Sequence, residues 1–351
     1  MDSRAVADAT HALLARAATA RSDGDGAACV AHLTEAVQLL SQSDLRELLG
    51  KVCWRLAKAG YDFEQHDVML DALAPVLGSD DPFAHAPGSR RALPAIATRW
   101  WDARGYADDR LNRLWGAWAR VHEAEGDPWM AASGRAQQAW HRACAGDHAG
   151  LDELVEQYLA LDPKRFGNGP HRHPDAPDTP SSVWWAQLEL LRIALWSTVW
   201  SDRRERALDL LDALEDAAEA AELHRASEAW FLDPACRAAI AFDLHDVRDR
   251  YAEAWIASLS RLDHPRAPFH LALARGLVAA SRGDRSTALP HLEDAVRLAD
   301  EGRFGAEWSM DARRELAKIL AADEPERAAR LRSEGSDLGA RFGIPWSAGG
   351  M

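Results

Sequence analysis

Residues 283–302 read GDRSTALPHLEDAVRLADEG, and this stretch decides the fold. Gly283-Asp284 separates two segments of helical periodicity, because glycine can end a helix in a left-handed conformation and aspartate can cap the next helix. Small or apolar residues follow five, nine and twelve positions after Gly283, at Ala288, Leu292 and Ala295. These positions share one face of a helix. The stretch therefore predicts a helical hairpin whose second helix packs closely on the first.

The same spacing recurs after four other short breaks in the chain. The last of the four sets fits least well, because it opens on a bulky tyrosine and closes on a hydroxyl. A small residue at the first position lets the second helix approach its partner closely. The sets are Cys29, Leu33 and Ala36 after Gly24; Leu151, Val155 and Tyr158 after Gly146; Ala207, Leu211 and Leu214 after Asp202; and Tyr251, Trp255 and Ser258 after Asp246.

The fold class that follows is all-α, an α-α superhelix of about 16 antiparallel helices. Apolar residues make up 47% of the 351 residues, which is enough for an ordered core. No segment alternates convincingly with the period of a strand. The expected helices are 3–22, 26–41, 44–59, 64–74, 91–103, 107–125, 128–145, 148–161, 182–200, 203–221, 224–243, 246–262, 267–282, 285–300, 304–321 and 324–341.

A resemblance to a known family accompanies this pattern. Gly276, Gly283-Asp284, Ala288, Leu292 and Ala295 match the small, turn and second-helix positions of the tetratricopeptide repeat. Residues 265–345 and 126–163 resemble the repeat regions of large actinobacterial transcriptional activators. The resemblance implies a tetratricopeptide-like solenoid that binds other molecules along its concave surface. The spacing of about 37 to 56 residues in the second half departs from a steady 34, and the ATPase loop and the basic recognition helix of those activators are missing.

Two sub-arrays are expected. Residues 163–181, rich in Pro, His and Asp, interrupt the helical pattern near the middle of the chain and read as a linker. The proposed organisation is therefore an N-terminal helical-repeat sub-array at 1–162, the linker at 163–181, and a C-terminal tetratricopeptide-like sub-array at 182–345.

Charge and cysteine usage restrict the class of partner. The net charge of −14 argues against nucleic acid and against anionic membranes, and it favours a basic protein or peptide partner. No signal peptide and no run long enough to span a membrane is expected. Four scattered cysteines without a C-x-x-C pair are typical of a reduced, cytoplasmic protein. No motif indicates a cofactor.

The densest group of metal-ligand residue types is His171, His173 and Asp175. An H-x-H pair on extended backbone can place two imidazoles on one metal, with the carboxylate as a third ligand. The alternative is a solvated linker that happens to contain two histidines, and this interpretation is favoured.

The 15 tryptophans are the stronger signal. Most fall on the first helix of an expected hairpin, and in tetratricopeptide-like stacks this helix lines the concave surface. Tryptophan offers a large apolar face, attracts cations and keeps one N–H donor. The alternative is that tryptophans such as Trp115, Trp118, Trp196 and Trp200 fill space between alanine-rich helices, which their helical spacing favours. The candidate ligand-binding residues are Trp101, Trp115, Trp118, Trp184, Trp185, Trp200 and Trp230.

Two functions from different classes remain. The first is a non-catalytic binding module that recognises a peptide or protein through a Trp-lined concave surface. The second is an enzyme or small-molecule receptor of specialised metabolism that holds a small apolar or aromatic ligand in the same scaffold. No local frame of nucleophile and base favours a particular chemistry, and the first function is preferred.

Overall fold

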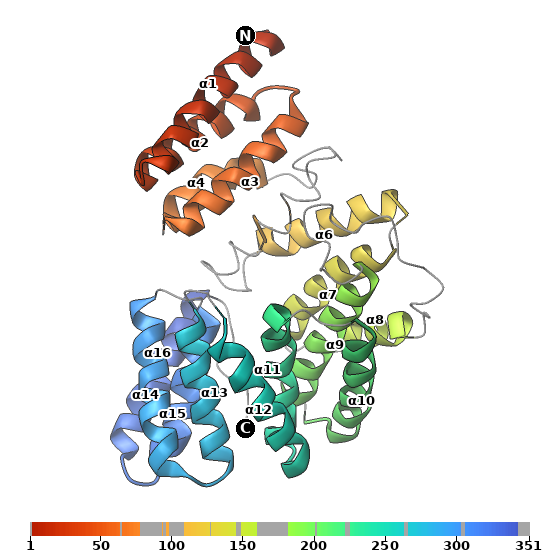
Figure 1. Ribbon diagram of the computed structural model, residues 1–351, viewed down its shortest axis with the longest axis vertical. Coiled ribbons are helices and arrows are strands. Elements are labelled where there is room, and N and C mark those ends of the chain that lie inside the picture. Colours follow the sequence, from red (N-terminus) through yellow and green to blue (C-terminus); the bar gives the residue numbers. More distant parts are fainter. Residues whose placement is uncertain are drawn as a thin grey trace. The chain divides into compact units, whose positions relative to one another are not determined.

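The chain is an all-α array of consecutively packed helices (Figure 1). The computed structural model describes residues 2–63, 65–77, 93, 96–97, 109–126, 128–144, 149–159, 182–200, 202–221, 225–262, 266–302 and 306–342. Fifteen helices lie in these ranges, which contain no strand. The prediction of the fold class is therefore confirmed.

Helix boundaries agree closely with the periodicity of the sequence. Among the helices that the structure describes, no boundary differs from its predicted position by more than three residues. Of the expected helix at 91–103, only residues 93, 96 and 97 are described, and all three are helical. The proposed linker at 163–181 lies outside the described residues.

The chain divides into two compact units, Met1–Gly134 and Arg135–Met351. The first unit contains α1 (Ser3–Ser22), α2 (Gly26–Ser41), α3 (Arg46–Asp62), α4 (His66–Leu77), α6 (Asp109–Ala124) and the first part of α7 (Pro128–Cys144). Helix α2 packs on α1, α3 and α4. The division between the units falls inside α7.

The second unit is built from helix pairs. After the rest of α7 and α8 (Ala149–Leu159), the closest packing joins α9 to α10, α11 to α12, α13 to α14 and α15 to α16. The bounds of these eight helices are Ser182–Trp200, Arg204–Ala221, Arg225–Ala241, His245–Ser260, Ala267–Ser281, Arg285–Glu301, Ala306–Leu320 and Pro325–Phe342.

The first helices of successive pairs touch one another: α9 contacts α11, α11 contacts α13, and α13 contacts α15. The second helix of a pair also packs on the first helix of the next pair, α12 on α13 and α14 on α15. We call α9, α11, α13 and α15 the first-helix layer, and α10, α12, α14 and α16 the second-helix layer. Figure 1 shows the four pairs in green to blue. Each pair can bury its apolar faces only against its neighbours, which is the physical basis of a repeat array.

The turns within the pairs use the chemistry that the sequence indicates. Gly24 and Gly283 have φ of 75° and 76°, in the left-handed region that glycine enters at low cost. The next residue caps the following helix in both cases. Asp25 accepts a hydrogen bond from the Ala28 amide at 2.9 Å, and Asp284 accepts one from the Thr287 amide at 3.1 Å.

One turn was misplaced by sequence reasoning. The break before α12 was predicted at His245-Asp246, but the left-handed residue is Asp243, with φ of 54°. The Leu244 amide closes this turn on the Ala239 carbonyl at 2.9 Å, as the Asp284 amide does on Ala279 at 3.0 Å. Aspartate here occupies the position that glycine holds at 24 and 283, as Asp202, with φ of 53°, does before α10. The error arose because a second aspartate, Asp246, lies three residues further on.

The corrected register changes which residues are equivalent. Counted from Asp243, the three positions are Arg248, Ala252 and Trp255, all of them buried. A shift of three residues stays on nearly the same helix face, so the predicted Tyr251 and Ser258 are buried as well. Arg248 therefore occupies the position that is small in the other pairs.

The corrected register also makes the repeat regular. Helices α10, α12, α14 and α16 begin at Arg204, His245, Arg285 and Pro325, which are 41, 40 and 40 residues apart. The interval in this unit is thus near 40 residues, longer than the 34 residues of a tetratricopeptide repeat.

The recurring apolar positions form the core of the pairs. Ala288, Leu292 and Ala295 have no exposed surface. A Cβ atom built on Gly276 of α13 would lie 2.6 Å from Cγ of Leu292, so glycine is required for this approach of α13 and α14. Every described side chain of the other predicted sets is also buried; these are Cys29, Leu33, Ala36, Leu151, Ala207, Leu211, Leu214, Tyr251, Trp255 and Ser258. The side chains of Val155 and Tyr158 are not described.

Among the residues that the structure describes, no helix combines the length and the apolar character that a membrane span requires.

Candidate functional site

A pair of opposite charges lies inside the apolar part of α11. From Phe231 to Phe242, Asp233 and Arg237 are the only charged residues. They are one helical turn apart, and Arg237 Nε donates to Asp233 Oδ1 at 2.6 Å. Both side chains are buried, at 7% and 8% exposure. Buried charges are tolerated in proteins when they are paired in this way.

A second group of charges lies along α15. Asp311 is buried and accepts a hydrogen bond from Arg314 Nη2. Arg314 Nε lies 3.5 Å from Glu315 Oε1, and Lys318 Nζ donates to the same oxygen at 2.9 Å. Exposure of the side chains rises along the group, from 7% for Asp311 to 45% for Lys318. The group therefore connects a buried carboxylate to solvent.

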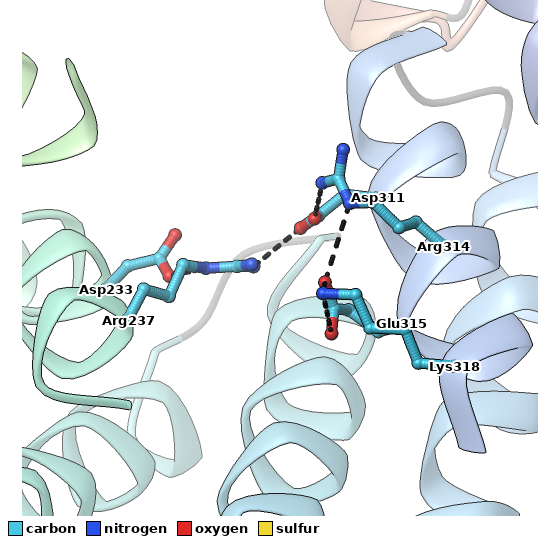
Figure 2. Close-up of polar contacts among 6 residues, drawn as sticks. All are labelled: Asp233, Arg237, Asp311, Arg314, Glu315 and Lys318. Carbon is cyan, nitrogen blue, oxygen red and sulfur yellow. Dashed lines mark hydrogen bonds and ion pairs between the residues drawn. The ribbon is translucent and has the colours of Figure 1, made fainter. Parts of the chain in front are cut away.

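The two groups meet across one intervening helix. Arg237 Nη2 lies 2.7 Å from Asp311 Oδ2, so α11 is joined to α15 although α13 lies between them in the first-helix layer (Figure 2). We call Asp233, Arg237, Asp311, Arg314, Glu315 and Lys318 the charged network. The long side chain of Arg237 thus bridges two helices that are not neighbours in the first-helix layer.

Aromatic rings flank the charged network. The guanidinium of Arg237 lies over the Trp196 ring of α9, 4.8 Å from its centroid. Trp196 in turn meets the edge of Trp140, with 6.4 Å between centroids. One turn before Asp311 on α15, Trp308 packs edge-on against His270 of α13 at 4.8 Å. All four helices of the first-helix layer thus contribute polar or aromatic side chains to this region.

The pKa shifts follow from the number of cations beside each carboxylate. Burial raises the pKa of Asp233, and Arg237 offsets this only in part. Burial also tends to raise the pKa of Asp311. The charges of Arg237 and Arg314 outweigh this effect and lower the pKa below its ordinary value. Burial disfavours charge on Arg237, yet Asp233 and Asp311 raise its pKa. Asp311 and Arg237 are therefore both charged and form an ion pair.

This arrangement is suited to recognition of charge. Replacing a buried ion pair with apolar side chains is often neutral or stabilising, so stability alone does not explain the charged network. The fit between its two halves is also imperfect. Arg237 Nη2 and Asp311 Oδ2 are close enough for an ion pair, but neither atom makes a well-directed hydrogen bond to any partner. Both atoms thus keep hydrogen-bonding capacity at a buried position.

Of the seven candidate tryptophans, two have described side chains. Trp115 and Trp118 of α6 are buried, and their rings lie 5.4 Å apart. Trp118 also meets the His122 ring edge-on at 5.3 Å. Together with the burial of Trp196, this confirms that the helical spacing of these tryptophans marks the core.

The remaining candidates are placed only in part. Trp184, Trp185 and Trp200 belong to α9 and Trp230 to α11, in the first-helix layer, but their side chains are not described. Trp101, His171, His173 and Asp175 lie outside the described residues. In the part of the chain that is described, no three His, Cys, Asp or Glu residues are grouped as a metal site requires.

Sequence reasoning missed the charged network. None of its residues was among the predicted site residues, although Asp233, Arg237 and Asp311 are buried. One signal was available, because Asp233 and Arg237 are the only charges from Phe231 to Phe242 and are spaced to pair. The contact to Asp311 has no such signal, since it joins residues that are 74 positions apart in the sequence.

The comparisons with known proteins assign no family. No protein-family model matches the chain, and no curated protein is similar to it in sequence. The charged network on the first-helix layer is therefore the feature of the second unit on which a functional proposal rests.

Proposed function

We propose that this protein is a non-catalytic helical-repeat module that binds a peptide or protein segment on the first-helix layer of its second unit. The observation that carries the proposal is the buried part of the charged network, Asp233, Arg237 and Asp311, with Arg237 over the Trp196 ring. Repeat arrays use the surface of such a layer for binding. Aromatic and arginine side chains are the residue types that dominate binding energy at protein interfaces. We place this module in the cytoplasm, because Cys29, Cys53 and Cys236 are separate, buried thiols.

A peptide-library screen tests this function. The immobilised full chain is incubated with peptides of basic, acidic and apolar composition, and bound sequences are compared with those held by Asp311→Asn. Asp323→Asn is the matched control, because Asp323 forms an exposed ion pair with Arg285 outside the charged network. We expect a defined peptide class that binds the wild type and the control and is lost with Asp311→Asn. If no peptide class is enriched, or if both variants bind equally well, the proposal is wrong.

A second candidate function rests on α6 in the first unit. Trp118 is 6% exposed, and its indole Nε1 has no hydrogen-bond partner. A buried unsatisfied donor is costly, and an acceptor on a small aromatic ligand would relieve this cost. Trp118→Phe keeps a smaller aromatic ring and removes the donor. For a small-molecule receptor, we expect a metabolite fraction to raise the unfolding temperature of the wild type and not that of this variant. Equal increases for both proteins would remove this candidate.

A further inference from the structure

The charged network has a feature that points to one kind of ligand. Arg237 is held by three groups from three helices: the Trp196 ring of α9, Asp233 of its own helix and Asp311 of α15. An aromatic face with carboxylates at its edge is an arrangement that binds a guanidinium, through cation–π attraction and charge-assisted hydrogen bonds. Arg237 thus occupies, from within the chain, a set of groups suited to a ligand arginine.

We infer that Trp196, Asp233 and Asp311 form a binding site for an arginine side chain of a basic peptide, which enters by displacing Arg237. This inference rests on the proposed function and names the chemistry of its ligand. Arg237, through its contact with Asp311, then acts as an internal competitor that a ligand must displace.

Charge balance favours a cationic ligand over an anionic one. When one guanidinium replaces another, both carboxylates remain paired, and the displaced Arg237 moves toward water, where its charge is stable. An anion bound to Arg237 would instead take Arg237 away from buried Asp233 and Asp311. Leaving a buried charge without its partner is strongly unfavourable.

The geometry also allows a ligand arginine to form hydrogen bonds to Asp311 that Arg237 does not form. Arg237 Nη2 and Asp311 Oδ2 lie 2.7 Å apart without a well-directed hydrogen bond, and the backbone of α11 limits how the guanidinium of Arg237 can be turned. A ligand arginine is free of this restraint and can place its planar donor fork on the carboxylate. The network reaches solvent at Lys318, whose side chain is 45% exposed. The net charge of −14 attracts a basic peptide.

The experiment uses the full chain and N-acetyl-arginine methylamide as the probe. Binding is measured by the rise in unfolding temperature with probe concentration, for the wild type and for Arg237→Ala, which removes the internal competitor. The matched ligand control is the citrulline analogue, which has nearly the same shape and no charge. The matched protein control is Arg297→Ala, because Arg297 pairs with exposed Asp294 and Glu301 on α14.

We expect Arg237→Ala to bind the probe about tenfold more tightly than the wild type, since the site no longer has to be vacated first. The citrulline analogue should have no effect, and adding Asp311→Asn should abolish the gain. Equal stabilisation of Arg237→Ala and Arg297→Ala, or equal effects of arginine and citrulline, would overturn the inference.

A second measurement covers the case in which Arg237→Ala does not fold. In the wild type, the Trp196 indole resonance, assigned with Trp196→Phe, should shift saturably with the arginine probe and not with citrulline. An unchanged resonance at saturating probe contradicts the inference. Failure here is distinct from failure of the proposed function, because the library screen can still enrich peptides that contain no arginine.

Discussion

At the scale of single residues, Gly276 sets the distance between two helices. A Cβ at this position would lie 2.6 Å from Cγ of Leu292, so Gly276→Ala should destabilise the protein by about 1–3 kcal/mol through overpacking. Leu292→Ala alone should cost about 2–5 kcal/mol by leaving a cavity. In the double variant the added methyl has room, so we expect its cost to be no larger than that of Leu292→Ala. Denaturant unfolding measures all three. Strictly additive costs would show that the two residues do not compete for space.

Residue identity also explains where sequence reasoning succeeded and where it failed. Glycine-aspartate turns were predictable, because only glycine enters the left-handed region freely and aspartate is a strong helix cap. The left-handed aspartate at Asp202 was placed correctly, whereas the turn at Asp243 was misplaced because Asp246, three residues later, offers a second possible break. Buried Arg248 was hidden by the same error, and its guanidinium donates to the Ser281 carbonyl at 3.0 Å.

At the scale of elements, ion pairs join successive helix pairs on the side of the second-helix layer. Arg250 of α12 pairs with Glu215 of α10, and Arg327 of α16 pairs with Glu293 of α14. Asp249 of α12 accepts hydrogen bonds from Arg248 and from Arg282, which follows α13. These contacts fix the stacking of neighbours, while the apolar triads fix the packing within each pair.

Asp249 gives this junction a defined pH dependence. Hydrogen bonds from Arg248 and Arg282 lower the pKa of Asp249 to about 2. A carboxyl whose pKa is lower in the folded state stabilises that state above the unfolded pKa of about 4 and loses this effect as the pH falls toward 2. The wild type should therefore be more stable than Asp249→Asn at pH 5, and the difference should shrink between pH 4 and pH 2. Thermal unfolding across this range checks the prediction, and curves that stay parallel would contradict it.

The ionic bridge between α11 and α15 predicts a non-additive series of substitutions. Arg237→Met leaves Asp233 and Asp311 buried without this partner, so it should cost about 3–5 kcal/mol. Combining Arg237→Met with Asp233→Leu and Asp311→Leu removes the unpaired buried carboxylates. Arg314 still has Glu315 as its ion-pair partner in this variant. We expect the triple variant to recover most of the lost stability in urea unfolding. A triple variant less stable than Arg237→Met would mean that the two carboxylates have other essential partners.

At the scale of the whole molecule, the cysteines report on the two units separately. Burial raises the pKa of Cys29, Cys53 and Cys236, the last to about 12, so these thiols should react only after unfolding. Cys29 and Cys53 lie in the first unit and Cys236 in the second. Gly60→Ala and Gly276→Ala are matched perturbations, since each places a Cβ 2.6 Å from a side-chain atom, of Met69 and Leu292 respectively.

We expect each substitution to move the denaturant midpoint of its own unit. In pulsed alkylation followed by peptide mass spectrometry, Gly60→Ala should lower the midpoint for Cys29 and Cys53 and leave that of Cys236 unchanged. Gly276→Ala should do the reverse. Equal shifts of all three thiols would show that the chain unfolds as a single cooperative unit.

The bridge between Arg237 and Asp311 also limits how this array can evolve. Repeat proteins commonly change length by gain or loss of whole modules, here about 40 residues each. An inserted module between α11 and α15 would carry Asp311 one step beyond the reach of Arg237 and would leave buried charges unpaired. These two side chains therefore oppose the insertion of a module in this stretch.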